Sequence, residues 1–169
     1  MPNYRRDRTA GGTWYFTVCL RDQTSDLLTR NVDLLRECVA GTMINQPFAA
    51  PAWVVLPSRM HCIWTLPPGD MDFSNRWKAI KGRFSRRLPD RPVFARVARR
   101  PREKGVWQNR FWEHRIRGAS DFQAHLWIVH QSPVQAGLVR RAEDWVYSSA
   151  HRTRRVGRTN LSDLRYQRM

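Results

Sequence analysis

Two apolar runs separated by a short turn constrain the fold of this chain more than any other feature. Residues 52–56 (Ala-Trp-Val-Val-Leu) and residues 60–66 (Met-His-Cys-Ile-Trp-Thr-Leu) are rich in β-branched and aromatic side chains, and Pro57-Ser-Arg59 lies between them. Such runs on either side of a tight turn are typical of a β-hairpin. The two strands must therefore pair in one antiparallel sheet, and the other elements must pack around them.

The segments around this hairpin alternate between strand and helix patterns. A strand is predicted where aromatic and β-branched residues cluster, and a helix where apolar residues recur every three or four positions. We predict strands at 12–20 and 106–117, helices at 29–43, 73–88 and 121–132, and a short packed element at 145–151. The last helix is expected to stop before Pro133, because a residue that precedes proline avoids the helical conformation. The order predicts an α+β fold, a ferredoxin-like sandwich with one antiparallel sheet of about four to five strands covered by helices.

Length and composition predict one cytoplasmic domain with basic extensions. The 169 residues match the usual size of a domain, and three cysteines without CxxC spacing indicate a reduced protein without a zinc ribbon. No apolar run approaches the roughly 18 residues of a membrane span, and the first residues lack a secretory signal, so no membrane partner is expected. We divide the chain into a basic arm at 1–11, a domain at 12–151 with a basic loop at 83–105, and a basic tail at 152–169.

The net charge predicts a polyanionic partner. Thirty basic residues against fourteen acidic ones give +16, and 27 of the basic residues are arginine. A GC-rich genome could explain the excess of arginine over lysine, but it does not explain the net charge. Residues 83–104 hold nine basic and two acidic side chains among three prolines, which favours an irregular loop that contacts phosphates over a merely solvated one. Nucleic acid is therefore the expected partner.

Several segments spread over the chain together resemble one protein family. They lie between about residue 4 and residue 152 and comprise Tyr4-Arg-Arg, Gly11-Gly-Thr-Trp14, Ala52-Trp-Val-Val-Leu-Pro57, Met60-His-Cys-Ile-Trp-Thr-Leu-Pro67, Phe73-Ser-Asn-Arg-Trp77, Trp107-Gln-Asn-Arg-Phe-Trp-Glu-His114, Pro133-Val-Gln-Ala-Gly137 and Trp145-Val-Tyr-Ser-Ser149. This set resembles the REP-associated tyrosine transposases, a branch of the single-tyrosine HUH transposase superfamily. The resemblance implies a ferredoxin-like domain that acts on single-stranded DNA, folded as a short palindromic hairpin with a guide tetranucleotide at its foot. For active members it also implies a tyrosine nucleophile and Mg²⁺ or Mn²⁺, with no nucleotide cofactor.

The positions at which the family carries its cleavage chemistry are substituted here. The resemblance implies two histidines two residues apart on a strand, and a tyrosine four residues before a polar ligand on a helix. This chain has Arg59 and His61 at the strand positions, and Ile128 and Ser132 at the helix positions. A guanidinium has no lone pair for a metal, isoleucine has no nucleophilic atom, and serine is a poor metal ligand. We therefore predict a DNA-binding protein without cleavage activity and expect no metal cofactor, since His61 is the one family ligand that remains.

The tyrosines offer no obvious substitute nucleophile. They are Tyr4, Tyr15, Tyr147 and Tyr166, so none lies on the third predicted helix. We interpret Tyr147 as a packed residue of the tail and Tyr4 as part of the arm. A hydroxyl poised beside His61 and a second imidazole would overturn the prediction of inactivity.

The predicted DNA contacts combine the basic arm, the turn of the hairpin, the second helix and the start of the last strand. They are Tyr4, Arg5, Arg6, Arg59, Lys78, Lys81, Arg83, Arg86, Arg87 and Arg110. Arg59 either contacts a phosphate in place of the metal or is a plain surface residue. Three aromatic residues, Trp14, Trp107 and Phe111, either stack on bases or belong to the core.

Two other functions stay open. The chain could be an active metal-dependent transposase or endonuclease with relocated catalytic residues, for which His130 is a weak candidate nucleophile. It could also be an RNA-binding or interaction module that uses the same sheet. We interpret His114 and His125 as hydrogen-bonded structural residues, with a supporting role near the site still open for His114. A DNA-binding role would place the protein at the nucleoid; no oligomeric state is predicted.

Overall fold

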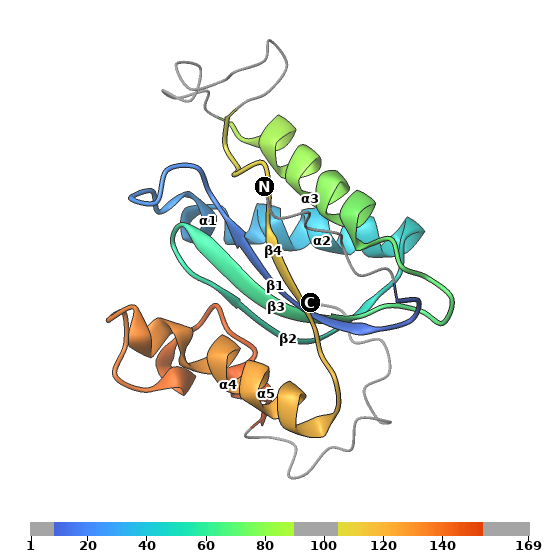
Figure 1. Cartoon of the computed structure of the whole chain (residues 1–169). Helices are drawn as coiled ribbons and strands as arrows, with labels where there is room; N and C mark the ends of the chain where they lie inside the picture. The colour runs from blue at the N-terminus through green and yellow to red at the C-terminus, as the bar shows by residue number, and fades with distance from the viewer. Residues whose placement is uncertain (1–8, 90–104, 154–169) are drawn as a thin grey trace, which may run out of the picture.

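The fold is an antiparallel four-stranded sheet with helices on both of its faces (Figure 1). The computed structural model describes residues 9–89 and 105–153 of the 169-residue chain. The strands are β1 (Thr13–Cys19), β2 (Ala49–Val55), β3 (Arg59–Thr65) and β4 (Trp112–Arg115). The helices are α1 (Leu27–Arg30), α2 (Val32–Asn45), α3 (Phe73–Arg87), α4 (Ala119–Gln135) and α5 (Ala150–Thr153), with a 3-10 turn η2 at Ala142–Asp144. The predicted α+β fold class is confirmed.

The strand order is β2-β3-β1-β4. The predicted hairpin pairs β2 with β3, and β1 pairs with β3 on the other side and with β4. The free side of β2 is covered by the chain after η2, because the Val55 amide donates to the Tyr147 carbonyl at 2.8 Å and the Ser149 amide donates to the Trp53 carbonyl at 2.8 Å. The sheet therefore ends at β4 on one side and at this tail segment on the other.

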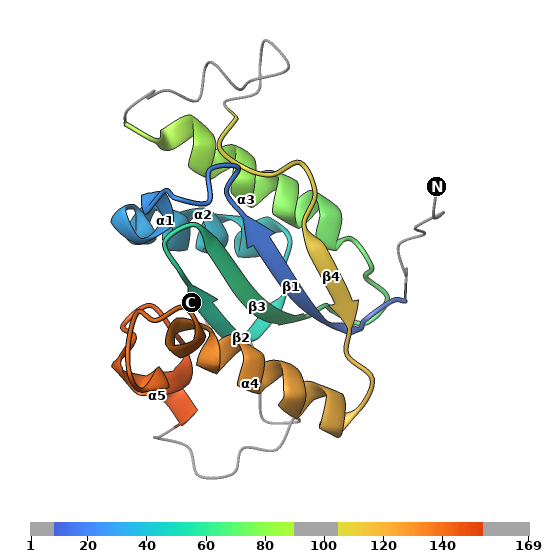
Figure 2. The ribbon, with the colours of Figure 1, turned by 60° about the vertical axis from the view of Figure 1, so that its left-hand side comes forward.

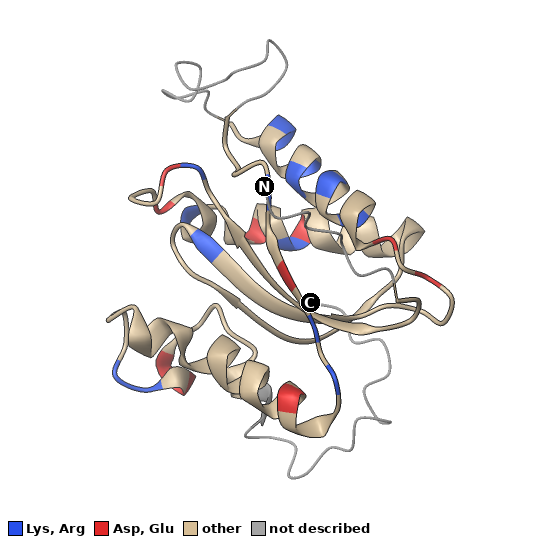
Figure 3. Cartoon of the chain, in the orientation of Figure 1, with Lys and Arg blue, Asp and Glu red and all other residues tan. Residues whose placement is uncertain are grey.

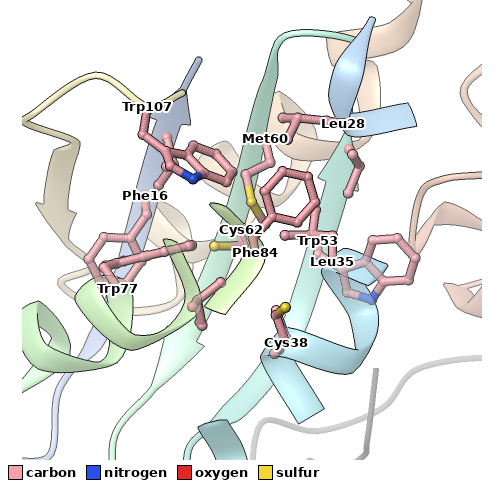
Figure 4. Packing of buried hydrophobic residues seen from close by; sticks show 14 of the residues in the cluster. Phe16, Leu28, Leu35, Cys38, Trp53, Met60, Cys62, Trp77, Phe84 and Trp107 are labelled. Atoms are coloured by element: carbon pink, nitrogen blue, oxygen red, sulfur yellow. The ribbon is translucent and has the colours of Figure 1, made fainter. Parts of the chain in front are cut away.

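The larger core lies between the sheet and the layer of α2 and α3. Because side chains alternate along a strand, Trp14, Phe16 and Val18 of β1 all point to this layer. Figure 4 shows Phe16, Met60 and Cys62 of the sheet meeting Trp77 and Phe84 of α3. Burial of each large apolar side chain stabilises the fold by about 1.5–3 kcal/mol, so this face holds most of the stability.

The opposite face of the sheet is covered less completely. Helix α4 packs against β2 and β3 through a smaller cluster of apolar residues: Tyr15, Ala52, Val54, Leu56, Ile63, Ile116, Phe122 and Val129. Figure 2 shows α4 on the other side of the sheet from α2 and α3, alongside β2 and β3. Polar and aromatic side chains of β1 and β4 are therefore left at the border of this smaller cluster.

A buried arginine fixes the start of α3. Asp72 caps the helix by accepting a hydrogen bond from the Asn75 amide at 3.0 Å. Arg76 is 3% exposed and pairs with Asp70 at 2.6 Å, and its guanidinium also donates to the Pro47 carbonyl at 2.8 Å. The hydrogen bond from Arg76 is the main cause that lowers the pKa of Asp70. The bond to Pro47 ties α3 to the connection between α2 and β2.

Three predicted elements differ from the structure. Helix α4 does not stop before Pro133 but contains it; the missing N–H removes one hydrogen bond near the helix end, and the Ala136 amide still donates to the Ser132 carbonyl at 2.9 Å. The strand predicted at 106–117 shrinks to β4, with Trp107 in an isolated bridge to Leu20. The helix predicted at 29–43 is divided at Asn31 into α1 and α2.

Parts of the predicted basic regions cannot be compared with the structure. Tyr4, Arg5 and Arg6, the loop residues 90–104 and the tail residues 154–169 lie outside the described residues. Residues 83–87, at the start of the basic segment, belong to α3. Within 9–89 and 105–153, no helix is long and apolar enough to cross a membrane.

Candidate functional site

The register of the sheet gathers the residues of the candidate site on the face that α4 partly covers. His61 of β3 pairs with Thr17 of β1, Thr17 pairs with Trp112 of β4, and Tyr15 pairs with His114 in the next row. Directly paired residues point to the same side of a sheet. We call this surface the polar face and define it by Tyr15, Thr17, Arg59, His61, Trp112 and His114.

His61 is held in a closed triangle of hydrogen bonds. Its Nδ1 lies 2.8 Å from Tyr15 Oη and 2.9 Å from Thr17 Oγ1, and Thr17 Oγ1 donates to Tyr15 Oη at 3.1 Å. Burial, and then the nearby charge of Arg59, lower the pKa of His61 to about 4. The imidazole is therefore neutral at physiological pH, with Nδ1 engaged inside the protein.

Arg59 begins β3 two residues before His61, so both side chains point to the polar face. Arg59 is exposed, and its partner across the sheet is Cys19. Its charge opposes the burial effect that raises the pKa of the Cys19 thiol. Arg59 thus places a permanent cation at the edge of the site, a group that suits a phosphate.

At the two helix positions, Ile128 has an apolar side chain and Ser132 is hydrogen-bonded within its own helix. Ile128 is half-buried against the cluster that contains Tyr15 and Val54, and Val54 is the β2 neighbour of His61. Ser132 is buried, and its Oγ donates to the Ile128 carbonyl at 2.5 Å. Arg59 and His61 therefore point to the side of the sheet on which Ile128 and Ser132 of α4 lie.

This set of residues does not fit a divalent cation. Arg59 offers a positive charge instead of a lone pair, and the hydroxyl of Ser132 is committed to a backbone carbonyl. His61 is then the single possible protein ligand among the four positions, and its Nδ1 is already shared between two hydroxyl groups.

A second cluster joins β4 to the first turns of α4. The carboxylate of Asp121 lies 3.0 Å from His114 Nε2 and 2.9 Å from His125 Nδ1, and it accepts from the Arg117 amide at 2.7 Å. The Arg117 amide and then His114 lower the pKa of Asp121. His125 Nδ1 also lies 2.9 Å from the Asp121 carbonyl oxygen. Both histidines are thus hydrogen-bonded, as predicted.

The ring geometry of this cluster argues against a metal ion, although its three possible ligand atoms lie within 4.8 Å of one another. The rings of His114 and His125 are 14° from parallel, with centroids 4.4 Å apart, so one is stacked on the other. An imidazole nitrogen donates its lone pair in the plane of the ring, and an ion could lie in only one of two stacked planes. The cluster therefore acts as a clamp between β4 and α4.

Tyr15 is the residue that sequence analysis missed. Its hydroxyl touches His61, and its ring centroid lies 4.9 Å from that of a second imidazole, His125. The hydroxyl thus lies beside one imidazole, whereas the second packs against the ring of Tyr15, so the condition for reversing the prediction of inactivity is met only in part. The chemistry also opposes a nucleophilic role, because Tyr15 is 4% exposed and burial is the main cause that raises its pKa. Alternation along β1 puts Tyr15 on the polar face, but only the register of β1 with β3 shows its contact with His61.

The other candidate nucleophiles lie in structural contacts. Tyr147 is half-buried against the larger core, and its ring packs edge-on against Trp145 with centroids 5.5 Å apart. His130 Nε2 lies 3.1 Å from Ser149 Oγ, and burial lowers the pKa of His130. Neither residue contacts His61 through a hydrogen bond found in the structure.

The predicted cations of the second helix lie on α3, across the sheet from the polar face (Figure 3). Several are tied to neighbouring groups: Lys81 donates to the Gln108 carbonyl at 3.0 Å, Arg83 donates to Thr42 Oγ1 at 3.0 Å, and Arg87 pairs with Glu37 at 2.5 Å. Lys78, Arg86 and Arg110 are exposed. Lys81 is the α3 cation that comes near Arg59, because the charges of both residues act to lower the pKa of the Cys19 thiol, against burial.

The aromatic residues divide clearly between core and surface. Trp14 and Trp107 are 1% and 8% exposed, and Phe111 packs against the larger core. Base stacking by Trp14 or Trp107 is therefore excluded in this structure. The large exposed aromatic side chains of the described residues are Trp112, at 55%, and Trp127, at 57%. Aromatic content alone could not separate these groups, because burial depends on the packing of α2, α3 and α4.

Comparison with known proteins identifies relatives over nearly the whole chain. No family model matches the chain. It is 43% identical over 152 residues to a REP-associated tyrosine transposase of Escherichia coli (strain K12), covering 90% of this chain and 84% of that protein. It is also similar to a solved structure of a REP-associated tyrosine transposase bound to a REP hairpin. The TM-score is 0.79 and the identity 40%, over 98% of both chains.

Proposed function

The chain belongs to the REP-associated tyrosine transposases, and from this we propose that it binds single-stranded hairpin DNA without cleaving it. The observation that carries the binding half is the match of nearly the whole fold to a relative bound to a REP hairpin. The net charge of +16 supports the same partner, because such a field attracts a polyanion.

Proposed phosphate contacts lie on two surfaces of the described fold. Arg59 and Arg110 are exposed near the polar face and β4, and Lys78 and Arg86 are exposed on α3. Arginine suits the first surface because its planar fork can grip a phosphate with two hydrogen bonds. A DNA hairpin that contacts both surfaces would have to pass around the β4 edge of the sheet.

The absence of cleavage is proposed from the groups at the four family positions. None of Arg59, Ile128 and Ser132 supplies the ligand or nucleophile that the resemblance implies. Without a nucleophile the remaining imidazole, His61, has no metal-dependent step to serve. The scaffold and its charge are then sufficient for binding alone.

A second candidate function, cleavage by relocated residues, is favoured by one observation, the contact of Tyr15 with His61. For Tyr15 to attack phosphorus, His61 would have to take its proton. Burial raises the pKa of Tyr15 and lowers that of His61 to about 4, so both shifts oppose this proton transfer. The small exposed fraction of Tyr15 also hinders in-line approach of a phosphate. We therefore favour binding over relocated cleavage.

The binding proposal is tested by titrating the protein with hairpin DNA over a salt series. Neutralisation of about five phosphates gives a slope of log K against log salt of roughly −4. Competition by structured RNA at fixed salt separates this proposal from an RNA-binding module. Failure to bind hairpin DNA at low salt, or stronger binding to the RNA, would contradict the proposed function.

The catalytic alternative has its own control. Tyr15→Phe removes the hydroxyl and keeps the ring, so hairpin affinity should be unchanged. If the wild-type protein cuts hairpin DNA with Mg²⁺ or Mn²⁺ and Tyr15→Phe does not, cleavage by relocated residues replaces our proposal.

A further inference from the structure

We propose that Trp112 is a stacking platform for an unpaired base next to the DNA hairpin. The inference rests on the proposed function, which supplies the hairpin, and adds a residue that contacts the unpaired part of the strand. Stacking on an aromatic ring requires an open base face, which unpaired nucleotides can present and bases within a duplex cannot.

Trp112 combines exposure with a fixed orientation. Its side chain is 55% exposed, yet its ring packs edge-on against Tyr15 with centroids 5.6 Å apart. It also lies 5° from parallel to the ring of His114, which Asp121 holds at 3.0 Å. A ring held this way loses little conformational freedom when a ligand stacks on it, so it is suited to binding.

The position of Trp112 lets single-stranded DNA approach it from the edge of the sheet. β4 is the terminal strand of the order β2-β3-β1-β4, and α4 packs mainly against β2 and β3, away from this edge. In Figure 2, β4 lies at the border of the sheet farthest from β2. Trp112 therefore sits where single-stranded DNA can reach the polar face without displacing a helix.

The charge around Trp112 favours a nucleotide over an apolar partner. Arg110 is exposed two residues before it, and Arg59 is exposed on the same face. The register places Arg59 two strands across and two residues along from Trp112, a separation of about 12 Å between Cα atoms at ordinary strand spacing. A short unpaired segment spans this distance, with its base on Trp112 and a phosphate near Arg59.

A matched control lies on the same molecule. Trp127, on α4, is 57% exposed and is the other exposed tryptophan among the described residues. Its loss removes the same ring area from the surface without touching the polar face. Trp112→Ala, Trp112→Phe and Trp127→Ala therefore separate a specific stacking site from general surface hydrophobicity.

The experiment measures the affinity of each variant for two probes at one salt concentration. One probe is a blunt DNA hairpin, and the other is the same hairpin with a single-stranded extension that contains 2-aminopurine. We expect Trp112→Ala to weaken binding of the extended probe by about 5- to 100-fold and to abolish the 2-aminopurine quenching. Binding of the blunt hairpin should be unchanged, Trp112→Phe should restore most of the loss, and Trp127→Ala should match wild type.

The outcomes distinguish this inference from the proposed function. If the wild-type protein binds neither probe, the proposed function fails. If it binds both but Trp112→Ala retains the affinity and quenching of wild type, the stacking site is refuted. Equal losses on both probes, or equal losses in Trp112→Ala and Trp127→Ala, also refute it. Thermal melts of the variants at the same salt show whether each loss occurs in a folded protein.

Discussion

We predict that the His61→Gln variant loses less stability at acid pH than the wild-type protein, because of the environment of His61. The pKa of His61 is about 4 in the folded protein, against an ordinary value of 6.5, because burial and then Arg59 disfavour the charged imidazole. Between these two values the unfolded chain binds a proton that the folded chain does not. Stability therefore falls as pH decreases from 6.5 toward 4.

The size of this effect follows from the two pKa values. Between pH 7 and pH 5 the difference in protonation lowers the free energy of unfolding by about 2 kcal/mol. Glutamine keeps hydrogen-bonding groups near Tyr15 and Thr17 but does not titrate. The variant should thus lose about 2 kcal/mol less than wild type over this range, whatever its stability at pH 7.

Urea denaturation at pH 7, 6 and 5 measures the difference directly. Other titrating groups contribute to both proteins, so they cancel when the change in wild type is compared with the change in the variant. If both proteins lose the same free energy between pH 7 and pH 5, His61 is not buried and neutral, and the described triangle is wrong.

Two further predictions concern the fold and the family positions. Arg76→Met should cost about 3–5 kcal/mol, because it leaves Asp70 and three backbone carbonyls without the guanidinium donor. The exposed Arg86→Met should change stability by less than about 0.5 kcal/mol. Thermal or urea unfolding of both variants checks this, and equal effects would contradict it. The combined variant Arg59→His, Ile128→Tyr and Ser132→Asn should gain Mn²⁺-dependent cleavage of hairpin DNA, which a sequencing gel detects. A triple variant that binds the hairpin well but never cuts it would refute the assignment of these positions.

Much of the fold follows from local patterns in the sequence. The hairpin of β2 and β3 was predictable because its apolar runs meet at a proline-containing turn, and α3 was predictable from its apolar face and from its boundaries. Pro133 misled the prediction, since a proline near a helix end removes one hydrogen bond that the following turn can tolerate. The extent of β4 could not be inferred from the sequence. Aromatic residues continue from the core-packed connection into the strand at 112–115, so they do not mark where the strand begins.

The placement of the four family positions was predictable from the sequence, but their contacts were not. Arg59 and His61 share a face because a strand alternates, and Ile128 and Ser132 share one because a helix repeats. The contact of Tyr15 with His61 depends on the pairing of β1 with β3, residues far apart in the sequence. The exposure of Trp112 likewise depends on where α4 packs, which no local pattern records.

Intact-mass analysis after incubation with hairpin DNA tests the separation of binding from cutting most directly. The wild-type protein is mixed with excess hairpin and Mg²⁺ or Mn²⁺, binding is verified by a mobility shift, and the denatured protein is weighed. We predict only the mass of the free 20.0 kDa chain and uncut DNA. A covalent protein–DNA adduct, on Tyr15 or any other residue, would contradict the account.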